Sequence, residues 1–248
     1  MTTVLKLGGS VITHKDDPET VDQNALEEIG EALAGTLADT ERLVLVHGGG
    51  SFGHHYADRY GVSTTEGSGE AAELAAIHGA MADLSDSVLS CLHDFDVQAL
   101  PVRPLSVACR DEDLHLETRV VEAMLEEGFV PVLHGDVVVD SGAGGTILSG
   151  DELVVSLARR LDAGRVGLCS TVPGVLDEGG AVVPRVDSLE DVAGALEATD
   201  ATDVTGGMAG KVRTLLDLSI PAHVFGLEGL PAFLEGKSPG TVVAGDDF

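Results

Sequence analysis

Lysine is rare in this chain, and three of its four lysines lie in or beside glycine-rich segments. Lys6 comes just before Gly8 and Gly9, Lys15 follows nine residues after Lys6, and Lys211 ends the run TGGMAGK. Glycine lets backbone N–H groups approach phosphate oxygens closely, and a lysine adds a positive charge beside them. The three lysines are therefore candidates for binding a phosphate group or for stabilising one during its transfer.

A second glycine-rich segment, HGGGSFGH at 47–54, follows an apolar run that predicts a strand. It matches the spacing of a dinucleotide-binding turn, which also requires an acidic residue at the end of the next strand, about twenty residues on. That region, 64–69, has a loop composition, so a nicotinamide-dependent oxidoreductase is disfavoured. A Walker A loop is absent as well, because the best candidate, 205–212, has Thr and Val at two required positions.

Three polar residues near these turns are further candidates. His54 ends the second glycine-rich segment, where a substrate oxygen could be reached. Asp136 follows the run FVPVLHG, and Asp151 follows Ser149-Gly150. Each aspartate could orient a lysine or hold Mg²⁺, although Asp151 could equally be a helix-start carboxylate that the helix dipole favours.

The elements that must position these residues alternate between strand and helix. We expect strands at 3–7, 42–47, 97–102, 129–133, 165–169 and 221–225, and helices at 22–38, 70–94, 149–161 and 207–218. Asp22 is the expected N-cap of the first helix, and 141–145 (SGAGG) is expected to be a loop. Short apolar strands that alternate with helices predict an α/β protein with a mostly parallel sheet covered on both faces. The apolar stripe from Leu74 to Val88 is interpreted as core or subunit interface, with the wall of an apolar substrate pocket as the alternative.

The composition excludes several classes of protein. A formal net charge of −28 disfavours nucleic acid and anionic membranes as partners, and it favours a salty environment in which the charges are screened. We expect no transmembrane helix and no signal peptide. Three dispersed cysteines make a disulfide framework unexpected and are consistent with a cytoplasmic protein.

Taken together, these motifs resemble the amino-acid-kinase superfamily, and within it the isopentenyl phosphate kinases. The resemblance covers nearly the whole chain and rests on five segments: KLGGSVIT-x-K (6–15), HGGGSFGH (47–54), PVLHGD (131–136), SGD (149–151) and DVTGGMAGK (203–211). It implies an amino-acid-kinase-like three-layer sandwich in one domain, with residues 1–164 as the acceptor-binding lobe and 165–248 as the ATP-binding lobe. It also implies ATP and Mg²⁺ as cofactors, isopentenyl phosphate as the acceptor in a mevalonate-type isoprenoid route, and a homodimer.

The resemblance also implies a role for individual residues. Lys15 would stabilise the phosphoryl group in transfer, with Lys6, His54 and Lys211 as the other catalytic candidates. The acceptor phosphate would be held by Gly49, His54 and Gly150. ATP would be bound by Lys6, Gly8, Gly9, Ser10, Gly50, Gly207 and Lys211. One run departs from the family pattern, since 170–177 (STVPGVLD) lacks the two acidic residues common there, and Thr171 or Asp177 is expected to substitute.

Other functions fit less well. A kinase of the same fold could take a fosfomycin-like phosphonate or a small carboxylate, and sequence separates these acceptors poorly. A non-catalytic nucleotide-binding protein is disfavoured, because binding alone does not need a lysine that stabilises the transferring group.

Overall fold

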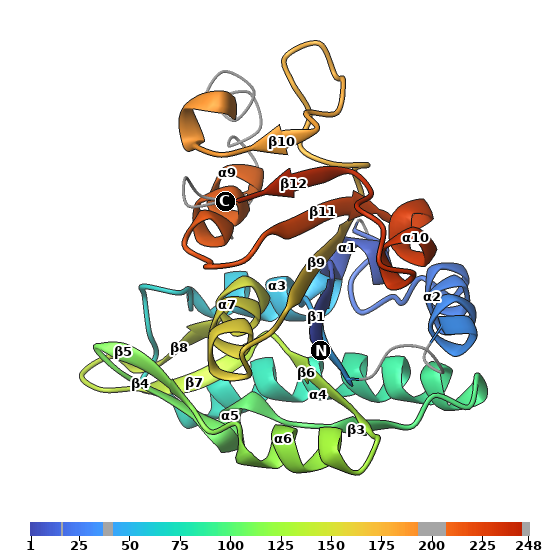
Figure 1. The fold of residues 1–248 in the computed structure, drawn as a ribbon. Helices are drawn as coiled ribbons and strands as arrows, with labels where there is room; N and C mark the ends of the chain where they lie inside the picture. Colours follow the sequence, from blue (N-terminus) through green and yellow to red (C-terminus); the bar gives the residue numbers. More distant parts are fainter. Residues whose placement is uncertain (16, 37–41, 193–206, 245–248) are drawn as a thin grey trace.

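A long twisted sheet forms the middle layer of the protein, and helices cover both of its faces (Figure 1). The structure is a computed structural model that describes residues 1–15, 17–36, 42–192 and 207–244. All neighbouring strands pair in parallel apart from β11 and β12. In order across the sheet, the strands are β10 (Arg185–Val186), β12 (Thr241–Val243), β11 (Ala222–Gly226), β9 (Arg165–Ser170), β1 (Thr2–Leu7), β2 (Arg42–His47), β6 (Val130–His134) and β3 (Ala99–Pro101).

Two apolar layers separate this sheet from its helices. On one face, leucines of β1 and β2 pack against α1 (Gly9–Ile12), α2 (Gln23–Thr36), α4 (Ala71–Asp94) and α10 (Leu230–Leu234). On the other face, valines of the same strands pack against α6 (Arg119–Glu126), α7 (Gly150–Arg160) and α9 (Gly207–Leu216). The sheet is buried on both sides, which explains why its strands read as continuous apolar runs. The predicted three-layer α/β sandwich is confirmed.

A smaller sheet, which the sequence analysis did not predict, lies beside α4. Its strands in order are β5 (Asp113–Leu116), β4 (Ala108–Asp111), β7 (Asp136–Asp140) and β8 (Gly144–Leu148). The expected loop at 141–145 is therefore partly wrong. Gly144 and Gly145 lie in β8 and pair with Asp140 and Val139 of β7. The remaining elements are α3 (Gly50–Tyr60), α5 (Pro104–Val107) and two 3₁₀ turns at Leu189–Val192 and Leu227–Gly229.

The predicted strands and helices are all present, with ends that differ by one or two residues. Asp22 caps α2 as expected, because its carboxylate accepts a hydrogen bond of 3.0 Å from the backbone N–H of Ala25. Residues 37 and 38 of the expected first helix lie outside the described residues.

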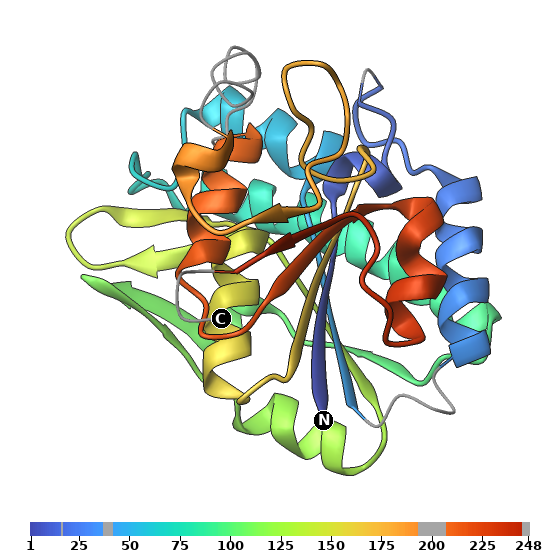
Figure 2. The same ribbon diagram turned by 45° about the horizontal axis from the view of Figure 1, so that its top comes forward.

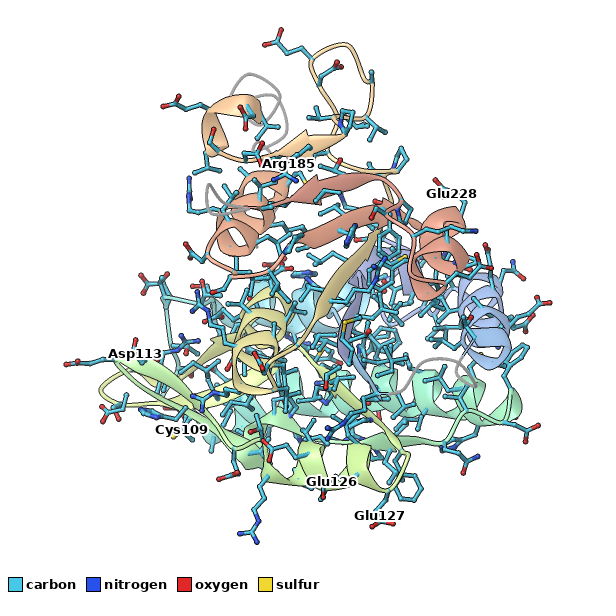
Figure 3. The ribbon with its side chains drawn as sticks, viewed as in Figure 1. Cys109, Asp113, Glu126, Glu127, Arg185 and Glu228 are labelled. Atoms are coloured by element: carbon cyan, nitrogen blue, oxygen red, sulfur yellow. The ribbon has the colours of Figure 1, made fainter. Side chains whose placement is uncertain are left out.

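The acidic residues lie mainly on the outside. Figure 3 shows the side chains of Asp113, Glu126, Glu127 and Glu228 pointing away from the layers, on different sides of the molecule. This distribution fits a charge that is spread over the surface instead of being concentrated at one site. In the described part of the chain, no helix is long and apolar enough to cross a membrane.

Candidate active site

The carboxyl ends of β1, β2, β6 and β9 meet at one edge of the sheet. Figure 2 shows β1 running from the N-terminus, at the base of the view, toward this edge. Leu7 pairs with His47, and His47 pairs with His134, so the three strands end level with one another. Each strand is followed directly by a glycine. The Gly8 N–H donates to the Cys169 carbonyl at 2.9 Å, and the Gly48 N–H donates to the Leu7 carbonyl at 2.9 Å. Parallel sheets bind ligands at this edge.

The two glycine turns touch each other so closely that only glycine fits. A Cβ on Gly9 would lie 2.1 Å from the backbone nitrogen of Gly50, and one on Gly48 would lie 2.6 Å from that of Gly9. Thr13 bridges the two turns, because its hydroxyl donates to the Gly9 carbonyl at 2.9 Å and accepts from the Ser51 N–H at 3.0 Å. Helices α1 and α3 begin at these turns, so their first amide donors are gathered at one place.

Lys6 is held by an aspartate across the same edge. Its Nζ lies 2.6 Å from Oδ1 of Asp151, and both side chains are mostly buried. Asp151 lies in the first turn of α7, where Ser149 and Glu152 form a reciprocal capping box. A Cβ on Gly150 would lie 3.0 Å from Cε of Lys6, so this glycine lets the start of α7 approach the lysine. Of the roles considered for Asp151, the geometry fits both orienting a lysine and acting as a helix-start carboxylate.

Asp136 has a different set of partners. Its buried carboxylate accepts hydrogen bonds from Nδ1 of His78 at 2.9 Å, from the Val137 N–H at 2.8 Å and from the Leu105 N–H at 3.3 Å. It joins α4, α5 and β7, and does not orient a lysine as was considered. Sequence gave no signal for this contact, because His78 and Asp136 are 58 residues apart.

One cavity of about 620 Å³ brings most of the candidate residues together. It is lined by three lysines, two glycine turns, two histidines and the start of α7. The candidates that line it are Lys6, Gly8, Gly9, Ser10, Lys15, Gly49, Gly50, His54, Asp136, Gly150, Asp151, Thr171 and Lys211.

Asp177 does not line this cavity. Asp177 is exposed, and its Oδ1 accepts hydrogen bonds from Gly179 N–H at 2.8 Å and Ala181 N–H at 2.9 Å, so it shapes a turn. Gly207 is the first residue of α9, whose Met208 and Lys211 line the cavity. The preceding residues of that motif, 203–206, lie outside the described residues.

The cavity has two sides. Beside β9 and α9 it is lined by Lys211, by Met208 and by residues between Ser170 and Leu176, several of them apolar. Beside α3, α4 and β8 it is lined by apolar side chains, namely Val62, Ile77, Met81, Ile147 and Leu148. Gly53 makes this side possible, because a Cβ there would lie 2.7 Å from the sulfur of Met81.

The apolar side explains the stripe on α4. Leu84 and Val88 are buried in the core as expected, but Ile77 and Met81 also line the cavity. Sequence reasoning considered such a wall only as the alternative, because helical spacing identifies an apolar face without showing what it packs against. Val62, in the loop after α3, and Ile147, in β8, were missed.

None of the three cysteines lines the cavity. Cys169 lies beside the Gly8 turn, and burial raises the pKa of its thiol to about 12, with a smaller contribution from Glu228. A thiol in this state is neutral and a poor nucleophile.

The fold and the site define a family. The model of the amino acid kinase family matches residues 1–226, and the chain belongs to that family. Within it, the chain is 59% identical to the isopentenyl phosphate kinase of Haloferax volcanii over 98% of both chains. It is 32% identical to the isopentenyl phosphate kinase of Methanocaldococcus jannaschii, over 91% of this chain and 90% of that one.

Solved structures agree with this assignment. A crystal structure of isopentenyl phosphate kinase superimposes with a TM-score of 0.84 at 28% identity, and the match covers 97% of this chain and 98% of that one. The predicted resemblance to this family is confirmed.

The contact between the glycine turns gives a test of the site. Gly9→Ala forces a Cβ against the backbone of Gly50, which cannot move aside as a flexible side chain could. We expect a loss of about 1–3 kcal/mol in the free energy of unfolding and weaker ATP binding. Urea unfolding and calorimetric titration with ATP measure the two effects. Gly69→Ala is the control, since a Cβ there meets nothing within 4 Å. Equal behaviour of the two variants would contradict the role given to the contact.

Proposed function

We propose that this protein transfers the γ-phosphoryl group of ATP to isopentenyl phosphate and so forms isopentenyl diphosphate. The observation that carries the proposal is the set of residues that line the cavity of about 620 Å³. Three lysines and two amide-rich turns lie beside an apolar recess, and His54 also lines the cavity. An acceptor with a phosphate head and a short hydrocarbon tail matches these surroundings. The relatives named above, which carry that activity in their names, support the same choice.

The chemistry requires positioning and charge more than acid–base catalysis. Phosphoryl transfer passes through a loose transition state, so the enzyme must align the two phosphates and neutralise their charge. A phosphate acceptor has a second pKa of about 6, so its attacking oxygen is already anionic at neutral pH. A general base is therefore not needed, and the difficulty is to bring two anions together.

The residues divide between the two substrates. We assign the acceptor phosphate to Gly49, His54 and Gly150, and the transferring group to Lys15. The nucleotide is assigned to the lysines, turns and loop near β9: Lys6, Gly8, Gly9, Ser10, Gly50, Thr171, Gly207 and Lys211. Asp177 would act there only by shaping the turn that follows this loop. On this assignment residues 1–164 form the acceptor lobe and 165–248 the ATP lobe.

Mg²⁺ would arrive with ATP, bound to its phosphates. The described residues contain no group of three or more histidine, cysteine, aspartate or glutamate side chains that could hold a metal ion. The ion would supply positive charge at the phosphates. We further propose that the protein works as a homodimer in a salty cytoplasm, within a mevalonate-type route to isoprenoids.

The acceptor is tested by measuring ATP consumption in high potassium chloride with Mg²⁺. We expect strong turnover of isopentenyl phosphate and little with fosfomycin, aspartate, glutamate, acetylglutamate or uridine monophosphate, because only the first combines a phosphate with an apolar tail. Preferred turnover of a phosphonate or a carboxylate would overturn the choice of acceptor. ATP binding with no turnover of any acceptor would favour a non-catalytic protein.

Lys15 is expected to act on the transition state and not on ground-state binding. In Lys15→Ala, kcat should fall by about 100-fold or more, while the Kd for ATP stays close to that of the wild type. Steady-state kinetics and calorimetry separate the two. Lys237→Ala is the matched control, because Lys237 is exposed and pairs with Glu235 away from the cavity. An unchanged kcat in Lys15→Ala would refute this role.

His54 is expected to bind and orient the acceptor phosphate without taking a proton. His54→Gln should raise the KM for isopentenyl phosphate by about tenfold, the effect of one weakened hydrogen bond to a charged group. The rate is measured at acceptor concentrations below KM, with His115→Gln, on the exposed β5, as control. Full activity under those conditions would show that His54 does not hold the acceptor.

A further inference from the structure

Two buried histidines lie directly beneath the glycine turns and have no role in the proposed chemistry. His47 and His134 are the last residues of β2 and β6 and pair with each other across the sheet. Their side chains are almost completely buried, and their ring centroids are 5.4 Å apart. Histidine is an unusual choice for a core position, since an apolar side chain would fill the space without a polar atom.

The hydrogen bonds of these rings define which nitrogen carries the proton. Nδ1 of His47 lies 3.1 Å from the Gly48 carbonyl, and Nδ1 of His134 lies 2.9 Å from the Gly135 carbonyl. A carbonyl can only accept, so both Nδ1 atoms must donate. Nε2 of His134 faces the Arg103 guanidinium at 3.3 Å, which can only donate, so this nitrogen is unprotonated.

The surroundings keep both rings neutral. Burial lowers the pKa of each imidazole to about 4, and the positive charge of Arg103 contributes in the same direction. Asp136, whose carboxylate binds His78, opposes this shift at His134 without reversing it. Nε2 of His47 is buried and has no hydrogen-bond partner in the part of the chain that the structure describes.

A hydrogen bond that holds a carbonyl also fixes the direction of the N–H group in the same peptide unit. The described chain has no cis peptide bond, and in a trans peptide the C=O and N–H groups point in opposite directions. With the Gly48 carbonyl turned to the His47 ring, the N–H of Gly49 points away from that ring. Lys6 precedes Leu7, the partner of His47, so its side chain projects from the opposite face of the sheet. The Gly49 N–H therefore faces the side of the cavity where Lys6 and Gly150 lie.

His134 acts on the neighbouring turn in the same way. It holds the carbonyl of Gly135, while the N–H of Gly135 donates to the His47 carbonyl at 3.0 Å. A Cβ on Gly135 would lie 3.5 Å from the backbone nitrogen of Gly150, so this turn packs against the start of α7. The two histidines thus fix both glycine segments between which the acceptor phosphate would lie.

We propose that His47 and His134 are positioning residues whose Nδ1–H groups hold the Gly48 and Gly135 carbonyls. His47 thereby orients the amide of Gly49, and His134 fixes the Gly135 turn against which the start of α7, with the amide of Gly150, packs beside the acceptor phosphate. The inference rests on the proposed function. It adds a second layer to the site, which contacts no substrate and acts only through the backbone.

A pair of variants separates this role from simple packing. Leucine and asparagine have nearly the same shape, but the side-chain amide of asparagine can donate from a position close to that of Nδ1, and leucine cannot. We expect His47→Leu to raise the KM for isopentenyl phosphate about tenfold or more while ATP affinity changes little, and His47→Asn to recover most of the loss. The same pair is made at His134. His115→Leu is the control for replacing an exposed histidine.

Two kinetic results would overturn the proposal. One is a wild-type KM for the acceptor in His47→Leu and His134→Leu. The other is equal damage in the leucine and asparagine variants, which would show that only the ring's volume matters. Circular dichroism and ATP titration identify any variant that has lost its fold.

A measurement on the wild-type protein does not depend on the folding of any variant or on the identity of the acceptor. Nitrogen-15 NMR of labelled histidine should show both rings as the neutral Nδ1–H tautomer between about pH 6 and 9. A protonated ring, or an Nε2–H tautomer at either position, would overturn the inference. Failure of the wild-type protein to turn over isopentenyl phosphate would instead overturn the proposed function, and this NMR result would still stand.

Discussion

The close approach of the Gly8–Gly9 turn to the Gly48–Gly50 turn is the contact on which the rest of the site depends. It requires β1 and β2 to run in parallel and to end level, so that both turns leave the sheet at one edge. It also requires the absence of a Cβ at Gly9 and Gly48. When these conditions are met, the starts of α1 and α3 lie together and their amide donors share one cavity. A shift of one residue in the register would separate the turns and reverse the faces of every side chain on β1.

The net negative charge of the protein affects how its phosphate-binding groups attract a nucleotide. A chain with a net charge of −28 repels nucleotides at long range, and salt reduces this repulsion beyond a Debye length of about 8–10 Å. Inside the cavity, backbone dipoles and three lysines act at short range, where salt screens little. Lys6 is already paired with Asp151, so part of the local positive charge is compensated before a nucleotide arrives. Backbone N–H groups carry no net charge. They therefore attract phosphate without the free-energy cost of burying a further charged side chain.

Much of the fold could be predicted from the sequence because the central strands are short apolar runs bounded by glycine. Strands β1, β2, β6 and β9 are buried on both faces, and each reads as one apolar run bounded by turn residues. The small sheet could not be found in this way. The segments ACRD and DLHL of β4 and β5 carry charges and a cysteine, and they become strands by pairing with each other and with β7.

The candidate site, like the fold, could be predicted from the sequence only in part. Lysines and glycines next to predicted strands were placed correctly at one edge, because the topology of a parallel sheet decides where its strands end. The pairing of Lys6 with Asp151 joins residues 145 positions apart, and orienting a lysine was only one of the roles that the sequence suggested for the aspartate. The stripe on α4 has a local pattern, but the pattern does not show that Ile77 and Met81 line a recess, and the paired histidines have no local pattern. Their function depends on which elements face each other, which only the packed structure reveals.

The continuity of the cavity has a consequence for ligand design. Because Lys211 at one side and Ile77 at the other line the same space, a single molecule could occupy both. A compound that joins adenosine to an isoprenyl tail through a chain of phosphates would lose its translational and rotational freedom once, where two separate ligands lose it twice. Its affinity should exceed that of either half by a large factor. The number of phosphates that gives the tightest binding would report the distance between the nucleotide and the acceptor in the working enzyme.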